Sequence, residues 1–459
     1  MCRYDAGSRI RGIMKTPILD FVQQYKETGE SRFHMPGHKG KAFLGMESLD
    51  ITEIDGADVL YSADGIIEES EDLVSSLFGT AHTFYSAEGS TLAIKAMLAL
   101  VSQHTNDEKP LILAGRNAHK AFIYGAALLD LDVEWLYPEP FSHLCKCEIT
   151  ADLLEKKLSG MTKKTCAVYI TSPDYLGQTS DIHALSQICQ NHDIPLLVDN
   201  AHGAYLHFLE QSEHPIALGA SMCCDSAHKT LPVLTGGAYL HISKNAPKQY
   251  LENARNMLSL FASTSPSYLI LQSLDRANRY LSDDYPTRLA STIRKIETIK
   301  AKLTEKGFIP EKSEPLKLVL HTAKYGYTGE QLAKHLKKHH IIPEFYDGEY
   351  LVLMITPENN SLDLARLTAA FDDIKPKKAL PSKTFSLQKS ISRMNLRKAM
   401  LGAQEIIPIK KAVGRICAAP TVSCPPAVPI VISGEEITEN AIEIFRFYGI
   451  EQIAVIKNT

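Results

Sequence analysis

The sequence predicts an α/β protein of two or three domains, built around a mainly parallel β-sheet with helices on both faces. The length of 459 residues exceeds what one small hydrophobic core usually organises. Between about residues 80 and 245, short apolar runs alternate with segments of helical spacing, which is typical of parallel sheets. The composition, 44% hydrophobic and 22% charged, is that of an ordinary globular protein.

The strands and helices of this region follow one another in a regular order. Strands are expected at residues 111–114, 133–137, 166–171 and 194–199, and helices at 118–130 and 183–192. Right-handed crossovers place the loops that follow parallel strands along one edge of the sheet, where ligands bind in open α/β sheets. Polar residues just after these strands are therefore the candidates for a functional site.

The pattern after residue 245 is first helical and then mixed. Helices are expected at residues 246–260, 268–281, 285–306 and 329–339, strands at 316–321 and 350–355, and a small α/β tail after residue 398. Residues 375–398 carry eight basic and no acidic side chains. Because the whole chain is acidic, we interpret this stretch as a solvated connection between domains, not as a nucleic-acid-binding arm.

Bulk properties exclude several classes of protein. The net charge of −4 disfavours binding to nucleic acid or to an anionic membrane. The nine cysteines lack the paired spacing of a zinc site, and unpaired thiols fit a reducing, cytoplasmic compartment. No apolar run approaches the roughly 20 residues needed to span a bilayer. Residues 1–13 lack the apolar stretch of a signal peptide, and Met14 resembles a natural start.

The segment DSAHKT at residues 225–230 is the strongest single feature. Lys229 is expected at the end of a short strand, flanked by the hydroxyls of Ser226 and Thr230. A fixed, partly desolvated lysine is suited to forming an imine with an aldehyde cofactor, because the neutral amine is the nucleophile. The two hydroxyls would reach phosphate oxygens. The alternative is that the same sequence forms a turn with an exposed lysine and binds no cofactor.

A buried strand ends in Asp199, thirty residues before Lys229. Enzymes that use pyridoxal 5′-phosphate (PLP) need an acid beside the pyridine nitrogen, because a protonated ring accepts electrons from the breaking bond. Aspartates also end strands in α/β enzymes that hold magnesium. The combination of Asp199 with Lys229 therefore carries the inference.

Residues 86–91, SAEGST, precede a helical pattern at 92–100. Gly89 permits a close approach, and Ser90 and Thr91 are expected to cap a helix whose free amides form an anion site. Ordinary capping without a ligand is the alternative. The chain has no P-loop motif, so a P-loop nucleotide enzyme is not supported.

His119 lies in the segment RNAHK, at the ligand edge of the predicted sheet. Its imidazole would stack on a cofactor ring and donate a proton to a carbanionic intermediate. A single histidine in a loop is common, so this interpretation depends on the neighbouring motifs.

Together these motifs resemble the Orn/Lys/Arg decarboxylases, a bacterial branch of the fold-type I PLP enzymes. The similarity runs from about Pro17 to the end of the chain. It includes the segments HMPGHKG (34–40), DITE (50–53), GST (89–91), NAHK (117–120), DNAHG (199–203), SAHK (226–229) and STSPSY (263–268).

The resemblance implies a fold-type I architecture, with a mainly parallel seven-stranded sheet in the large domain and smaller α/β domains after it. The expected parts are an N-terminal arm at residues 1–30, a PLP-binding large domain at 31–284, a small α/β domain at 285–375 and a C-terminal decarboxylase domain at 376–459.

The resemblance also implies a role for each site residue. Lys229 would be the Schiff-base lysine, Asp199 the partner of the pyridinium and His119 the ring-stacking histidine. The other implied cofactor-binding residues are Ser90, Thr91, His202, Ser226 and His228, with Ser263 or Thr264 reaching the cofactor of a partner subunit. Shared sites of this kind require a two-fold symmetric homodimer. No metal site is implied.

Three residues match the pattern of the family or depart from it. Glu344 matches an acidic residue near the substrate in family members. Cys424 replaces a usual tyrosine near the substrate, which leaves the identity of the substrate open. Asn200 stands where many relatives carry an acid, and we expect no effect on a central step. The large decamer-forming relatives carry an N-terminal wing that this sequence does not show, so a decamer is not expected.

The expected reaction is removal of the α-carboxylate of a basic amino acid as CO2. Arginine is the first expected substrate, followed by lysine or ornithine, because short wingless members are often associated with arginine and polyamine synthesis. An aminotransferase is the alternative. Those enzymes clamp the substrate carboxylate with an arginine of the small domain, and Arg366 is the sole arginine between residues 295 and 390. A non-catalytic PLP-binding regulator would normally carry a DNA-binding domain, and none is visible.

Overall fold

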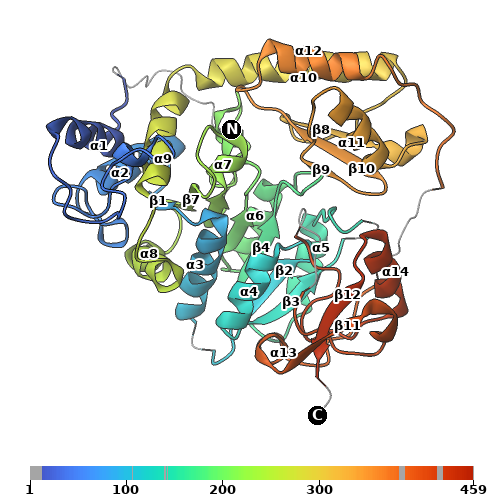
Figure 1. Cartoon of the computed structure of the whole chain (residues 1–459). Helices are drawn as coiled ribbons and strands as arrows, with labels where there is room; N and C mark the ends of the chain where they lie inside the picture. The colour runs from blue at the N-terminus through green and yellow to red at the C-terminus, as the bar shows by residue number, and fades with distance from the viewer. Residues whose placement is uncertain are drawn as a thin grey trace. The chain divides into compact units, whose positions relative to one another are not determined.

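A computed structural model describes residues 13–105, 107–138, 141, 143–381, 388–420 and 427–457. Its central feature is a seven-stranded sheet with the strand order β1-β7-β6-β5-β4-β2-β3 (Figure 1). The strands are β1 (His82–Ser86), β2 (Leu111–Gly115), β3 (Asp132–Leu136), β4 (Thr165–Thr171), β5 (Leu196–Asp199), β6 (Met222–Asp225) and β7 (Ala238–Ile242).

The strands of this sheet run mainly in parallel. Strand β5 pairs in parallel with β6, and β2 pairs in parallel with β3. Strand β7 is antiparallel to both β1 and β6. Every residue of β5 and β6 is buried, which explains why their sequences are continuous runs without polar alternation.

Helices follow the strands as the alternating sequence pattern predicts. They are α1 (Pro17–Thr28), α2 (Ile66–Phe78), α3 (Gly89–Gln103), α4 (Lys120–Leu128), α5 (Ala151–Ser159), α6 (Ile182–Asn191), α7 (Ala227–Thr230), α8 (Lys248–Phe261), α9 (Tyr268–Ser282) and α10 (Tyr285–Glu305). Helix α3 packs against α8, β6 and β7. Its apolar residues from Leu92 to Val101 are buried, and this burial fixes the place of its first turn.

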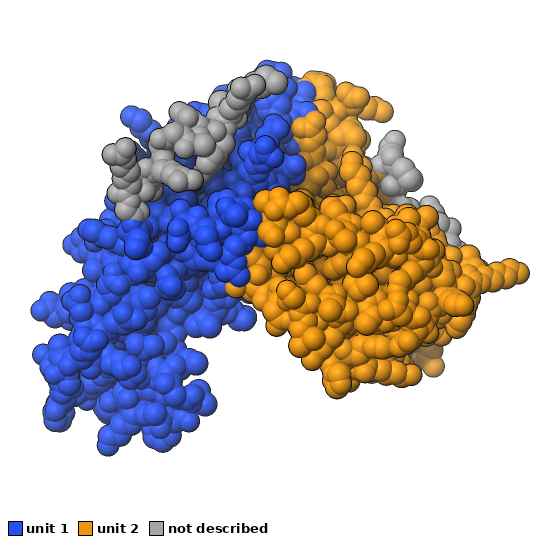
Figure 2. All heavy atoms as spheres, turned by 90° about the horizontal axis from the view of Figure 1, so that it is seen from above, with its two compact units in different colours: residues 1–106, 166–169, 182–289 blue, residues 107–165, 170–181, 290–459 orange. Residues whose placement is uncertain are grey.

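Two compact units make up the chain (Figure 2). Unit 1 comprises residues 1–106, 166–169 and 182–289, and unit 2 comprises residues 107–165, 170–181 and 290–459. Lys229 and Asp199 belong to unit 1, whereas His119 and Glu344 belong to unit 2. The domain boundaries expected from the sequence remain a prediction.

Unit 2 also contains two small sheets. The first has the order β8-β10-β9, with β8 (Lys317–His321), β9 (Phe345–Tyr346) and β10 (Tyr350–Met354), and is accompanied by α11 (Gly329–Lys338) and α12 (Ser361–Ala370). The second pairs β11 (Gln404–Pro408) with β12 (Gln452–Ile456), near α13 (Leu396–Leu401) and α14 (Glu439–Phe447). The predicted α/β character of both C-terminal parts is confirmed.

Two further predictions can be compared with the structure. No helix among the described residues is long and apolar enough to cross a membrane. No disulfide joins the seven cysteines that the structure describes. Residues 1–12 lie outside the described part of the chain, and so does Cys424.

Candidate active site

Lys229 lies on the short helix α7, not at the end of a strand as the sequence suggested. Strand β6 ends at Asp225, the last residue that pairs with β7. After Asp225 the backbone forms a helical turn, in which Lys229 N donates to Ser226 O at 2.9 Å. The helix carries the lysine to His202, and Lys229 Nζ lies 3.3 Å from His202 Nε2.

His228 is held by a glycine carbonyl on the other side of this helix. Its backbone N–H and its ring Nδ1 both bond to Gly237 O, at 3.1 and 3.0 Å. Burial lowers the pKa of His228, and the nearby Lys229 amine acts in the same direction against the bond to Gly237. The ring is therefore neutral near pH 7, with its proton on Nδ1 and a lone pair on Nε2.

Asp199 ends strand β5 and is 2% exposed. Its Oδ2 accepts a hydrogen bond from Tyr169 OH at 3.1 Å, and its Oδ1 accepts one from Ala201 N at 3.2 Å. The Cys224 thiol lies 3.7 Å from Oδ1. Among the residues that the structure describes, no cationic side chain forms an ion pair with this carboxylate.

Ser90 meets Ser226 at the start of α3. Ser226 Oγ donates to Ser90 Oγ at 2.7 Å. The expectation that Ser90 and Thr91 cap this helix is wrong, because the helix begins at Gly89 and both hydroxyls lie inside its first turn. Gly89 has a φ of +70°, which only a glycine adopts without strain, and its N–H donates to Gly236 O at 2.7 Å.

These residues of unit 1 fit a phosphorylated pyridine aldehyde. The buried Asp199 has no cationic partner within the described part of the chain, as a partner for a protonated ring nitrogen requires. Thr230 Oγ1, on the same short helix as Lys229, is buried with no hydrogen-bond partner among the described residues, which leaves a hydroxyl donor unused. Thr91 is exposed in the same first turn. The hydroxyl donors suit a phosphate at one end of the cofactor, and the Asp199 carboxylate suits a cationic ring at the other.

His119 occupies the N-cap position of α4 in unit 2. Its Nδ1 accepts a hydrogen bond from Ala121 N at 3.1 Å, so the neutral ring carries its proton on Nε2. Arg116, three residues earlier, is buried and donates to the carbonyls of Pro429 and Ile430 at 2.8 and 2.9 Å. The arginine of this motif therefore holds the C-terminal segment, a role that the sequence analysis did not assign.

Glu344 is exposed at the rim of a cavity of about 550 Å³ in unit 2. Its Oε1 accepts a hydrogen bond from Tyr175 OH at 2.6 Å. Glu330 and Asp347 also line this cavity, and none of its described lining residues is cationic. The cavity therefore presents carboxylates beside the aromatic rings of Phe447 and Tyr448.

Ser263 and Thr264 lie exposed before α9. Ser263 N donates to Glu88 Oε1 at 2.6 Å, which ties this segment to the residue that precedes α3. The Ser263 hydroxyl accepts from Ser265 N at 3.1 Å. The two predicted hydroxyls therefore stand at the surface of the unit that contains Ser90.

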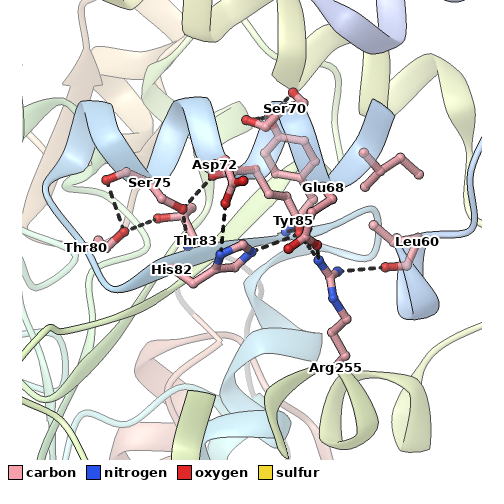
Figure 3. Close-up of polar contacts among 12 residues, drawn as sticks. Leu60, Glu68, Ser70, Asp72, Ser75, Thr80, His82, Thr83, Tyr85 and Arg255 are labelled. Atoms are coloured by element: carbon pink, nitrogen blue, oxygen red, sulfur yellow. Dashed lines mark hydrogen bonds and ion pairs between the residues drawn. The ribbon is translucent and has the colours of Figure 1, made fainter. Parts of the chain in front are cut away.

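A second group of polar residues in unit 1 surrounds the buried Glu71. Figure 3 shows His82 from β1 and Arg255 from α8 turned toward the carboxylates of α2. Arg255 NH2 lies 2.7 Å from Glu71 Oε2 and also bonds to Glu68, while NH1 donates to Leu60 O at 3.1 Å. This group joins α2, β1, α8 and the short turn at Leu60.

Comparison with protein families gives two matches. The family model described as Orn/Lys/Arg decarboxylase, major domain, matches residues 16–310. The model described as Orn/Lys/Arg decarboxylase, C-terminal domain, matches residues 381–454. Together they span both units.

Individual proteins show the same likeness. The chain is 28% identical to the uncharacterized protein YaaO of Bacillus subtilis, covering 94% of this chain and 93% of that protein. It is also 28% identical to an arginine decarboxylase of the same organism, with the same two coverages. The solved lysine decarboxylase LdcF of Francisella novicida superposes with a TM-score of 0.78 at 16% identity, over 96% of this chain and 81% of that one. Structural likeness extends to other fold-type I PLP enzymes, which confirms the predicted fold class.

Proposed function

The chain belongs to the Orn/Lys/Arg decarboxylase family, and on this premise we propose that it is a PLP-dependent decarboxylase of a basic amino acid. The observation that carries the proposal is the pair formed by Lys229 and Asp199. The lysine is half-buried beside His202, and the carboxylate is buried without a cation from the described residues. An imine-forming amine and an uncompensated acid are what a pyridine aldehyde requires.

The residues of unit 1 would hold the two ends of the cofactor. Lys229 would bind the aldehyde, Asp199 the ring nitrogen, and Ser90, Thr91, Ser226 and His228 the phosphate. Bound PLP supplies an electron sink for the pair of electrons that leaves the Cα–carboxylate bond. His202 Nε2, 3.3 Å from Lys229 Nζ, would accept the proton that the amine must lose before it reacts.

His119 would contribute the proton that replaces CO2 at Cα. Its Nδ1 accepts from Ala121 N, so the proton of the neutral ring sits on Nε2, the nitrogen that would donate it. The N-cap position also fixes the direction of the ring, because the bond to Ala121 N is part of the helix end.

A basic substrate is supported by the acidic cavity at Glu344. A cation carried into a partly closed site needs a negative partner, since an unpaired buried charge costs several kcal/mol. Glu344 supplies an exposed carboxylate there, whereas Glu330 pairs with Lys334 Nζ at 2.8 Å and Asp347 Oδ2 lies 3.4 Å from His143 Nε2. Arginine is the first proposed substrate and lysine the second. The similar proteins include one named arginine decarboxylase and one named lysine decarboxylase. A panel of basic and neutral amino acids tests the effect of Cys424 on the choice of substrate.

We also propose that the active form is a homodimer with shared sites, located in the cytoplasm. The loop before α2 exposes large apolar side chains, including Phe33 at 95% and Leu44 at 87%. Surfaces of this kind are typically covered by a partner chain. The exposed hydroxyls of Ser263 and Thr264 would then face the cofactor of the other subunit.

The test is product analysis together with trapping of the cofactor. Purified protein supplied with PLP should turn yellow and release CO2 from arginine or lysine without forming a keto acid. Lys229→Ala should lose the absorbance band and all turnover. Borohydride reduction should label Lys229 and no other lysine. Keto-acid formation would instead indicate an aminotransferase, and labelling of a different lysine would refute the assignment.

A further inference from the structure

A buried carboxylate next to the lysine helix is bonded by three side chains from separate segments. Asp225 Oδ2 accepts hydrogen bonds from His214 Nε2 at 3.0 Å and from His241 Nε2 at 3.1 Å. Asp225 Oδ1 accepts one from Asn200 Nδ2 at 2.7 Å. Asp225 and both histidine side chains are 0% exposed. None of these residues was singled out for this network by the sequence.

The two histidines favour the charged form of Asp225. Burial acts to raise the pKa of Asp225, but His214 and His241 outweigh it and hold the pKa well below its usual range. Burial lowers the pKa of His241 despite the adjacent carboxylate. The result is a buried anion held by N–H donors, which is stable only while each donor stays in place.

The remaining ring nitrogens also have partners. His241 Nδ1 lies 2.9 Å from the hydroxyl of Thr83, which Figure 3 shows beside Thr80 and Ser75. Ile216 N donates to His214 Nδ1 at 3.4 Å, so the other ring nitrogen, Nε2, carries the proton donated to Asp225. A protonated Nε2 is a hydrogen-bond donor and not a metal ligand, although Cys223 lies close enough to complete a set of four.

Asn200 connects this network to the turn that follows β5. Its backbone N–H donates to Cys224 O at 3.0 Å, and its carbonyl accepts from Gly203 N at 2.8 Å. The side-chain amide lies against Gly203, where a Cβ would stand 2.0 Å from Asn200 Oδ1. That oxygen is buried without a hydrogen-bond partner among the described residues. The Asn200 side chain therefore leaves its oxygen unpaired, which is unfavourable, while its N–H donates to Asp225.

We propose that Asp225 is a positioning residue of the active site, which joins the ring end to the lysine end of the cofactor through Asn200. The turn from Asn200 to Gly203 follows Asp199 and carries His202, while Ser226 and Lys229 follow Asp225 directly. The bond from the Asn200 amide to Asp225, beside the backbone bond from Asn200 N to Cys224 O, thus holds the turn against the lysine helix, where His202 lies 3.3 Å from Lys229 Nζ.

This assignment deepens the proposed function and rests on it. It also gives a reason for the departure at Asn200. The family resemblance implies an acid at that position in many relatives. Here an acid at the end of the neighbouring strand, Asp225, accepts the hydrogen bond of the Asn200 amide.

The test is the variant Asn200→Asp, which places a second carboxylate at the position of the amide. Two carboxylates at this distance must share a proton, so the pair holds together at low pH and repels at high pH. We expect a new descending limb in the pH profile of kcat, with a loss of at least ~10-fold above the limb. The absorbance band of bound PLP should change over the same pH range. The titratable groups that face the pair are Asp199, His207, His214, Cys223, Cys224, Tyr239 and His241.

The exchange variant Asn200→Asp/Asp225→Asn serves as the rescue. It restores one carboxylate and one amide, and the new amide oxygen at 225 can still accept from both histidines. It should remove the new pH limb and recover kcat to within about 3-fold of wild type. If Asn200→Asp alone does not fold, the exchange variant should restore the melting temperature. Failure of the exchange to restore folding or the profile would overturn the assignment.

His207→Gln is the matched control. His207 packs in the same ring cluster, 5.9 Å from the ring of His214, but bonds to Leu77 O and not to Asp225. It should lower stability without adding a pH limb.

Three results separate the possible failures. A wild-type profile and spectrum in folded Asn200→Asp would overturn this inference alone. Stoichiometric zinc in the wild-type holoenzyme that is lost in His241→Ala would overturn it too, since the cluster would then be a ligand set. A wild-type protein that binds no PLP would refute the proposed function itself, and this inference with it.

Discussion

Two buried carboxylates of unit 1, Glu71 and Asp199, differ in what balances their charge. Glu71 is 0% exposed, and its Oε2 accepts from Arg255 at 2.7 Å and from His82 at 3.1 Å. Its Oε1 accepts from Tyr85 N at 2.8 Å. Asp199 is as deeply buried, but its partners are a hydroxyl, a backbone amide and a thiol.

The difference separates a carboxylate that holds the fold from one kept for a ligand. Glu71 already has a guanidinium, so its role is to join α2, β1 and α8. A buried carboxylate without a cation is costly to fold. Asp199 ends a strand at the edge of the sheet where ligands bind in open α/β proteins. A bound molecule with a positive charge would there offset the energetic cost of burying the carboxylate.

The largest expected effect on activity follows from changing Asp199. Asp199→Asn keeps the size and shape of the side chain but removes the negative charge, so the cofactor ring becomes a poorer acceptor of electrons. We expect PLP to stay bound while kcat falls by about 100- to 1000-fold. Steady-state kinetics and the absorbance band measure the two effects. Turnover close to wild type would mean that another acid serves the ring nitrogen.

The same change at Glu71 should act on stability. Glu71→Gln leaves Arg255 without its buried partner and should lower the free energy of unfolding by about 3 kcal/mol. The kcat per folded molecule should stay within about 2-fold of wild type. Urea denaturation and active-site titration with PLP separate these quantities. A large loss of kcat in fully folded protein would erase the distinction between the two carboxylates.

An exposed carboxylate sharpens the comparison. If Glu344 binds the distal cation of the substrate, Glu344→Gln should lower kcat/KM for arginine or lysine by roughly 10- to 150-fold, through KM. A neutral analogue should be little affected. Equal losses on charged and neutral substrates would place Glu344 at the reacting end, and no loss at all would make it an ordinary surface residue.

The smallest expected effect tests the surface of unit 1 near Ser263. A subunit with Ser263→Ala and Thr264→Ala is combined with a subunit that carries Lys229→Ala. The intact lysine of the first receives wild-type hydroxyls from the second, so about one site per heterodimer should recover activity. Verified heterodimers that stay inactive would show that these hydroxyls do not reach a neighbouring cofactor.

Much of the fold follows from local pattern. The apolar runs at β2, β4 and β5 and the helical spacing of α8, α9 and α10 place each of these elements within two or three residues of its bounds in the structure. A strand buried on both faces has apolar side chains at consecutive positions. This pattern can be recognised in the sequence without knowing which strand or helix packs against it.

The sequence analysis was wrong at positions that depend on where the hydrogen-bonded pairing of two strands, or a helix, begins or ends. Lys229 was expected at a strand end, but the ladder between β6 and β7 ends at Asp225 and the chain turns into a helix. Ser90 was expected to cap α3, yet the helix begins two residues earlier than such a cap requires, at Gly89, which adopts a left-handed conformation. In both cases the deciding hydrogen bonds come from segments far along the chain.

The sequence by itself therefore determined the α/β class and the residues Lys229, Asp199 and His119 as candidates, because strand ends and motif spacing are local properties. Only the tertiary structure decided that Asp225 is held by His214, His241 and Asn200. These partners lie between 11 and 25 residues from Asp225 along the chain, with no fixed spacing among them. A buried charge is satisfied by whichever donors the packing brings within hydrogen-bond distance, and that depends on the whole fold.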